Sequence, residues 1–177
     1  MEINYIKECF KYHDGDLFWK VRPLHHFKCE KDQKAFNKKL SGNKVGGLTG
    51  AKGDKYLATS INNKMTHVHR IVFMLHHGFI PNYIDHIDGN RLNNKIENLR
   101  SVTSSENAKN RKANSNNTSG YTGVFWCKKS NKWGAAITSN RKRIYLGLYE
   151  NKDDAIAKRV EAEKDNGFTS RHGKSMP

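Results

Sequence analysis

The amino-acid sequence predicts an α+β protein made of two modules joined by a linker. Short strand-like runs separated by glycine and asparagine turns indicate antiparallel sheets, and several periodic or capped segments indicate helices. The stretch KANSNNTSG at 112–120 lacks any large apolar residue, which is typical of a linker. We therefore expect a first module over 1–111, a linker over 112–119 and a second module over 120–168, followed by a tail over 169–177.

The first 41 residues predict a helix, a turn and a strand, followed by a less regular segment. Apolar residues at helical spacing predict a helix over 3–12, and Asp14-Gly15 marks a turn before a strand over 17–21. The segment 24–41 is basic and has no clean period. We interpret it as an insertion or an exposed helix.

The next segment predicts three short strands and an amphipathic helix. Strands are expected over 43–48, 56–61 and 64–68, with an Asn-Asn turn between the last two. Val68, Ile71, Val72 and Leu75 follow at i, i+3, i+4 and i+7, which predicts a helix that ends near Gly78.

The segment 83–112 is rich in Asp, Asn and His and cannot be mostly core. We expect a strand over 83–86, a turn at 88–90, an irregular loop, a strand over 100–102 and a helix from Ser104. Thr103 and Glu106 have the spacing of a capping box, which places Asn107 in the first turns of that helix.

The second module predicts a three-stranded sheet packed on one helix. Strands are expected over 121–126, 132–138 and 143–149, and a helix over 152–166. Alternation in the third strand predicts that Ile144, Leu146 and Leu148 face the helix, with Arg143 and Tyr145 on the other face.

Composition favours a nucleic-acid partner. Lys and Arg number 32 against 17 Asp and Glu, a net charge of +15, which suits a polyanion. No apolar run approaches the roughly 20 residues of a membrane span, so we expect no membrane association, no export and a cytoplasmic protein. The three cysteines form no Cys-x-x-Cys pair, which argues against a disulfide framework and a structural zinc knuckle.

Residues for phosphodiester cleavage occur together in the 83–112 segment. Hydrolysis needs a base to activate water and a cation to neutralise the phosphate oxygens. Asp85 and His86 supply a carboxylate and an imidazole side by side, provided that the strand ends there. The side-chain oxygen of Asn107 is able to complete a site for a hard metal ion with Asp85.

Around these residues the chain resembles the HNH endonucleases of phages and introns, the homing-endonuclease branch. The resemblance covers roughly 55–112 and rests on VHRIV at 68–72, IDHIDGN at 84–90, Asn93-Asn94, NLRSVT at 98–103 and Glu106-Asn107. It implies a ββα-metal fold in which His86 is the general base and Asp85 and Asn107 bind one divalent ion. It also implies that Asn98 holds the loop and orients His86 through backbone hydrogen bonds. Asn107 stands where many members have a histidine, which favours Mg²⁺ or Mn²⁺ over zinc.

The other histidines have plainer interpretations. His69, next to Arg70 at the start of the helix, either orders the site or contacts phosphate, or is a packed structural histidine. The pairs His25-His26 and His76-His77 are interpreted as solvated or minor DNA contacts, because no carboxylate lies at helical spacing beside either pair.

The second module predicts a DNA-binding surface. Between Ser105 and Tyr149 there are nine basic residues and one acidic residue, and a twisted sheet with one basic face suits the major groove. The motifs SGYTGV at 119–124, KWGAAI at 132–137, YLGLY at 145–149 and DAIA at 154–157 resemble the Apetala-type domain of plant ethylene-response factors. The predicted DNA contacts are Lys128, Lys132, Arg141, Arg143 and Tyr145, together with Arg70 of the first module. Thr122, Phe125, Ala136 and Thr138 depart from that family's charged readers, so its recognised sequence does not transfer.

The sequence therefore predicts an HNH nuclease joined to a DNA-targeting domain and acting on double-stranded DNA without an organic cofactor. The resemblance implies a phage or mobile element and an infected bacterial host. The alternative is a non-catalytic DNA-binding regulator that retains a nuclease fold; a nucleic-acid-binding zinc protein is disfavoured by the cysteine spacing. The sequence leaves open the recognised site, nicking versus double-strand cleavage and the oligomeric state.

Overall fold

The computed structural model describes residues 2–51, 55–109, 117–139 and 142–168. The chain divides into two compact units, residues 1–102 and 103–177, and each is described by itself. The predicted division at a linker over 112–119 falls inside the second unit, and 110–116 and the predicted tail lie outside the described residues. The boundary between functional modules therefore stays a prediction.

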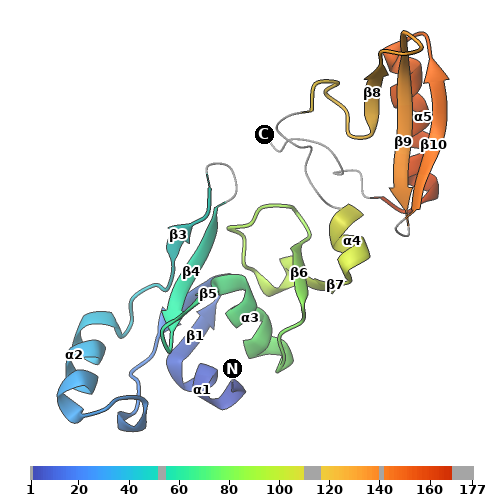
Figure 1. Ribbon diagram of the computed structural model, residues 1–177. Helices are drawn as coiled ribbons and strands as arrows, with labels where there is room; N and C mark the ends of the chain where they lie inside the picture. The colour runs from blue at the N-terminus through green and yellow to red at the C-terminus, as the bar shows by residue number, and fades with distance from the viewer. Residues whose placement is uncertain (1, 52–54, 110–116, 140–141, 169–177) are drawn as a thin grey trace. The chain divides into compact units, whose positions relative to one another are not determined.

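The first unit is built from small antiparallel sheets around two core helices (Figure 1). In chain order its elements are α1 (Ile3–Cys9), β1 (Phe10–His13), β2 (Asp16–Trp19), η1 (Leu24–His26), α2 (Glu30–Leu40), β3 (Gly47–Thr49), β4 (Tyr56–Ile61), β5 (Lys64–His67), α3 (Val68–His77), β6 (Tyr83–His86), η2 (Ile96–Asn98) and β7 (Leu99–Val102). The strands pair as β1–β2, β3–β4–β5 and β6–β7.

The helix predicted over 3–12 is wrong in its last three residues. The chain turns extended at Phe10, and β1 pairs with β2 with Phe10 opposite Trp19. Asp14 and Gly15 both have positive φ, the conformation of a two-residue hairpin turn. Pairing buries Phe10 and Trp19 together, with ring centroids 4.6 Å apart, which a longer helix would prevent. The strand predicted over 17–21 accordingly ends at Trp19.

Helix α3 organises the core of this unit. It packs against α1, β4, β5 and η2, and its residues Ile71 and Val72 are fully buried. The helix ends at Gly78, whose φ of 79° is left-handed and whose N–H donates to Met74 O. The periodicity therefore predicted this element and its end correctly.

The segment 24–41 forms η1 and the exposed helix α2, none of whose residues is buried. The strand predicted over 43–48 is reduced to an isolated bridge between Phe18 and Lys44 and the short strand β3. Across the described residues, no helix is both long and apolar enough to cross a membrane.

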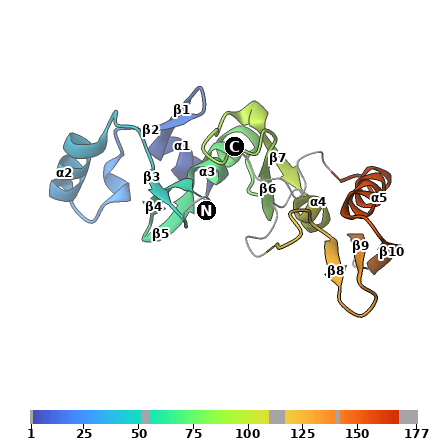
Figure 2. The ribbon, with the colours of Figure 1, turned by 90° about the horizontal axis from the view of Figure 1, so that it is seen from above.

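The second unit contains a three-stranded antiparallel sheet with a helix along one face (Figure 2). Its elements are α4 (Ser104–Lys109), β8 (Val124–Cys127), β9 (Lys132–Ser139), β10 (Lys142–Tyr149) and α5 (Lys152–Asp165), with β9 central. Val124, Ala135 and Ala155 form the centre of the packing between sheet and helix.

A bulge in β10 changes which residues face the helix. Tyr145 pairs with Ala136 and Gly147 with Ala135, so Leu146 is the extra residue. Beyond it the alternation reverses, and Leu148, opposite Gly134, joins Arg143 and Tyr145 on the outer face. The prediction that Leu148 faces the helix is therefore wrong, because strict alternation cannot anticipate an inserted residue.

A buried ion pair within α5 is hydrogen-bonded to the loop before β8. Arg159 Nη2 lies 3.2 Å from Glu163 Oε1, and Arg159 Nε donates to Thr122 O at 3.0 Å. Tyr121 Oη donates to Glu163 Oε2 at 3.2 Å. Gly123 lies between this guanidinium and β9, with φ of 83°.

We predict that Gly123→Ala destabilises the second unit far more than Gly120→Ala. Both glycines have left-handed φ, but a Cβ at Gly123 would collide with Ala136 O and the Arg159 side chain, whereas at Gly120 the nearest atom is Lys152 Nζ at 4.0 Å. Backbone strain alone should cost about 1 kcal/mol, and strain with overpacking at least about 3 kcal/mol. Urea unfolding of both variants measures the difference. Equal losses would show that the close approach at Gly123 is not tight.

Candidate functional site

Asp85 and His86 are the last two residues of β6. The β6–β7 pairing sets Asp85 opposite Arg100 and His86 opposite Leu99. Adjacent side chains leave a strand on opposite faces, and the strand ends at His86, where Gly89 N–H closes a turn by donating to His86 O at 2.8 Å. The two side chains are therefore held at the start of a loop, as the sequence analysis required.

Asn98 holds the two ends of this loop together. Its buried side chain accepts from Asp88 N–H at 2.9 Å and donates to Asp88 Oδ1 at 2.9 Å and to Asn93 O at 2.8 Å. Its carbonyl also accepts from Ile87 N–H at 2.8 Å. These bonds determine the backbone path directly after His86.

Asp88 completes this network as a carboxylate. Burial opposes its ionisation, but hydrogen bonds from Asn93, Asn98 and the backbone of Asn90 together lower the pKa of Asp88 below its ordinary value. The loop is thus held by an ionised acceptor, which forms stronger hydrogen bonds than a neutral one.

The His86 ring is buried and its orientation is set by Asn94. His86 Nε2 lies 3.2 Å from Asn94 Oδ1, while Asn94 Nδ2 donates to Leu92 O. An amide oxygen only accepts, so Nε2 carries the ring proton and Nδ1 carries the lone pair. Burial lowers the pKa of His86, which keeps the ring neutral at neutral pH.

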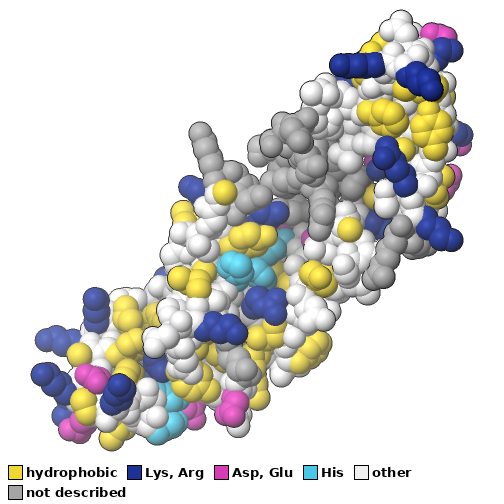
Figure 3. Space-filling model, viewed as in Figure 1, with side chains coloured by type: hydrophobic (Ala, Val, Ile, Leu, Met, Phe, Trp, Pro, Cys, Tyr) yellow, Lys and Arg dark blue, Asp and Glu magenta, His cyan; other side chains and the backbone are white. Residues whose placement is uncertain are grey.

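Two further histidines and a tyrosine pack beside His86. The His69 ring meets that of His86 edge to face with centroids 5.1 Å apart, and His67 stacks on His69 at 5.4 Å. Tyr56 lies against both His67 and His69, and the Arg91 guanidinium lies over the Tyr56 ring. Figure 3 shows histidine side chains reaching the surface of the first unit with Lys or Arg next to them.

His69 is a packed histidine. It is only 7% exposed, and burial, followed by the neighbouring His86, lowers its pKa to about 3. Of the two interpretations left open by the sequence, the structure favours the packed one. Burial also lowers the pKa of His67, with Arg70 contributing, so this cluster is neutral at neutral pH.

Asp85 is paired with Arg100 across the hairpin. Arg100 Nε and Nη2 both donate to Asp85 Oδ2, at 3.0 and 2.7 Å. The pair fixes the direction of the carboxylate. It follows from the register of β6 and β7, which the sequence pattern does not specify.

Arg70 supports the loop that leads into β6. Its guanidinium donates to Pro81 O at 3.0 Å and to Asn82 O at 3.5 Å. The DNA contact predicted for Arg70 stays a prediction.

Asn107 lies in α4, at the start of the second unit. The predicted capping box is confirmed: Thr103 N–H donates to Glu106 Oε2 at 2.7 Å, and Glu106 N–H donates to Thr103 Oγ1 at 3.2 Å. Because Asn107 and Asp85 belong to different units, their joint binding of a metal ion stays a prediction.

The outer face of the second sheet carries three of the predicted DNA contacts. Register places Lys132, Arg143 and Tyr145 on this face, with Phe125 packed over Gly134 and the Arg143 guanidinium 5.7 Å from the Phe125 ring centroid. Tyr145 is 57% exposed. Lys132 Nζ forms an ion pair with Glu150 at 2.7 Å. Lys128 is exposed beyond β8, and Arg141 lies outside the described residues.

The interpretation as solvated side chains fits the exposed His25 but is wrong for His26. Both imidazoles contact the carboxylate of Glu8, and the side chain of His26 is buried. Glu8 is 17 residues from His25, so a search for carboxylates at helical spacing could not find it.

Asn94 is one of the site residues, with Asp88, Arg100, His67 and Tyr56, to which the sequence analysis assigned no role. It lies in the quoted Asn93-Asn94 pair, but nothing in the pattern distinguishes the buried amide from its exposed neighbours. What distinguishes Asn94 is its almost complete burial, which only the structure shows.

Comparisons with known proteins agree with this location. The model of an HNH endonuclease family matches residues 66–109, so this stretch is an HNH endonuclease domain. Protein 3.8 of Escherichia phage T7 is 44% identical over 61 residues, which cover 34% of this chain. The matched stretch spans half the length of that relative. No solved structure matches the chain.

We predict that Asn98→Ala destabilises the first unit by about 2–4 kcal/mol, because it removes three part-buried hydrogen bonds that hold the loop. Asn90→Ala is the matched control, since Asn90 is exposed and its side chain accepts one bond, from Leu92 N–H; it should cost less than about 1 kcal/mol. Chemical denaturation followed by circular dichroism compares them. Similar losses for the two variants would show that Asn98 does not hold the loop.

Proposed function

We propose that the protein is a metal-dependent HNH endonuclease that hydrolyses phosphodiester bonds in double-stranded DNA. The observation that carries this proposal is the state of His86: a neutral, buried imidazole whose proton is held at Nε2 by Asn94, at the end of the strand that also carries Asp85. The family match over 66–109 supports it.

His86 acts as the general base in this proposal. A base must present a lone pair at the operating pH, and the Asn94 contact leaves that lone pair on Nδ1. Nδ1 takes a proton from the attacking water, and the developing imidazolium is stabilised by the negative charges of Asp85 and Asp88, both of which favour the protonated ring. The 3′ oxygen leaves, so the ends are a 5′-phosphate and a 3′-hydroxyl.

His69 and Asn94 are positioning residues. His69 is neutral and packs edge to face on His86, so it limits ring rotation without adding positive charge. Asn94 fixes the tautomer, and Asn98 orients His86 through the backbone of Ile87 and Asp88.

Nucleases of this family generally use a divalent metal ion, and Asp85 fits that requirement. Arg100 directs both of its bonds to Oδ2 and fixes the direction of the carboxylate, which is proposed to bind the metal. Asn107 is proposed to contribute its amide oxygen. One carboxylate and one amide form a hard donor set that suits Mg²⁺ or Mn²⁺. The ion supplies charge neutralisation at the phosphate.

Residues 120–168 are proposed to be the DNA-targeting module. The outer face defined by Lys132, Arg143 and Tyr145 combines cations with an exposed aromatic ring, and the chain's net charge of +15 favours a polyanionic partner. The family match ends at residue 109 and does not reach this module. The assignment therefore rests on the sequence resemblance to an Apetala-type domain and on the charge of the outer face.

A homing role in a phage or mobile element, with action in the cytoplasm of an infected bacterium, is part of the proposal. The similarity to a phage protein supports the phage origin within this proposal. The competing function is a DNA-binding regulator that retains the nuclease fold, and a cleavage assay separates the two.

We predict that the protein nicks or linearises supercoiled plasmid in Mg²⁺ or Mn²⁺ and that His86→Ala lowers the single-turnover rate by about 10²–10⁴-fold, the range for loss of a general base. His77→Ala is the control, because His77 is exposed on α3. Plasmid cleavage followed on agarose gels measures the rates. A His86→Ala rate within twofold of wild type would exclude this base, and an inactive wild type that still binds duplex DNA would favour the regulator.

We predict that Lys132→Ala/Arg143→Ala weakens binding of the full-length protein to duplex DNA and flattens its salt dependence. Each phosphate contact contributes about 0.9 to the logarithmic salt slope, so two lost contacts lower the slope by roughly 1.8. Lys158→Ala/Lys164→Ala removes two cations from α5 and is the matched control. Gel-shift titrations at several salt concentrations measure both quantities. The proposed surface is wrong if the control variant loses as much affinity, or if the outer-face variant binds normally and loses only cleavage at saturation.

A further inference from the structure

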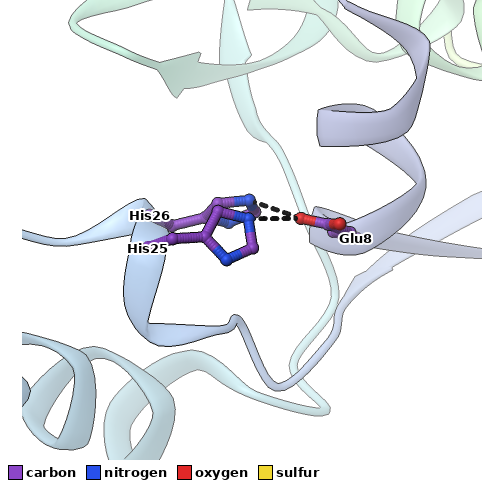
Figure 4. Close-up of side chains that lie close together, drawn as sticks. All are labelled: Glu8, His25 and His26. Atoms are coloured by element: carbon purple, nitrogen blue, oxygen red, sulfur yellow. Dashed lines mark hydrogen bonds and ion pairs between the residues drawn. The ribbon is translucent and has the colours of Figure 1, made fainter.

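A second group of potential metal ligands lies in the N-terminal elements. Glu8 in α1 faces His25 and His26 in η1, and both imidazoles point toward its carboxylate (Figure 4). Glu8 Oε2 lies 3.0 Å from His25 Nε2 and 2.8 Å from His26 Nε2. The three ligand atoms all lie within 4.8 Å of one another, so one ion could contact all three.

The buried nitrogen of His26 points to an ion in this group. His26 Nε2 has no hydrogen-bond partner, although Glu8 Oε2 is 2.8 Å away and the His26 side chain is only 2% exposed. The approach is therefore close, but its direction is not that of a hydrogen bond. A buried nitrogen whose only close contact lacks hydrogen-bond geometry is costly, and two ligand atoms that converge on a common ion lie close together in this way.

We infer that Glu8, His25 and His26 form a binding site for a zinc-type divalent ion. Two imidazoles and one carboxylate are ligands that Zn²⁺ accepts, and three protein ligands leave a fourth position for water. His25 and Glu8 are partly exposed, which provides a path for the ion and for that water. The donor set differs from that proposed around Asp85, since imidazole favours zinc over Mg²⁺.

Zinc binding through His26 Nε2 requires a change in the hydrogen bonds at the other ring nitrogen, Nδ1. Arg22 Nε donates to His26 Nδ1 at 3.1 Å, and Cys9 Sγ lies 3.8 Å from the same nitrogen. A neutral imidazole that binds metal through Nε2 carries its proton on Nδ1. Binding therefore exchanges the Arg22 bond for a contact from Nδ1–H to the Cys9 sulfur. Arg22 retains its bond to Tyr5 Oη and its positions over the Tyr5, Phe27 and Phe36 rings.

The bound ion would join α1 to the segment that leads into α2. η1 is a single turn, and the side chains of His25 and His26 connect it to α1 through Glu8. The site accordingly has a structural role, and it does not depend on the proposed nuclease activity.

The test uses the full-length, ¹⁵N-labelled protein titrated with ZnCl₂ and long-range ¹H–¹⁵N spectra of the imidazoles, which report each histidine separately. We expect the ring signals of His25 and His26 to shift with one equivalent of Zn²⁺ and the thermal unfolding midpoint to rise. His25→Gln and Glu8→Gln should each weaken zinc binding at least about tenfold. His77→Gln is the matched control, and His86→Ala should retain the site whether or not it cleaves DNA.

His25→Gln keeps the test valid if other variants fold poorly, because the His25 side chain is two-thirds exposed. The inference is overturned if Zn²⁺ shifts only other histidines, such as those around His86. It is also overturned if folded His25→Gln and Glu8→Gln bind zinc as tightly as the wild type.

Discussion

The site around His86 depends on the hydrogen bonds that Asn98 makes to the loop. One buried amide and its own carbonyl contact Ile87, Asp88 and Asn93, so both ends of an otherwise irregular segment are fixed by one residue. The loop contributes little apolar area of its own, and its order therefore depends on polar contacts. The positions of His86 and Asn94 follow from this constraint.

Burial then sets the chemistry of the histidines. α3 places His69 at the edge of the core, where desolvation keeps it neutral, and the His86 ring packs against it. A fixed neutral ring is the state that the proposed general base needs. The same packing that stabilises the first unit thus holds His86 in that state.

The second unit shows how local irregularity changes a surface. The bulge at Leu146 moves Leu148 to the outer face beside Tyr145, and Gly134 admits the Phe125 ring to that face. The outer face is consequently more apolar than strict alternation implies. Aromatic and aliphatic side chains therefore lie beside the cations Lys132 and Arg143 on this face.

The sequence by itself determined the elements whose signals are local. The hairpin turn at Asp14-Gly15, the end of α3 at Gly78 and the capping box of Thr103 and Glu106 all follow from contacts within a few residues. The order of Asp85, His86, Asn98 and Asn107 likewise predicted where the HNH domain lies. Only the tertiary structure decided the pairs that are distant in sequence: Arg100 with Asp85, Asn94 with His86, His69 against His86, and Glu8 with His25 and His26. The physical reason is that strand register, burial and helix packing bring these groups together, and none of the three is specified by the spacing of residues along the chain.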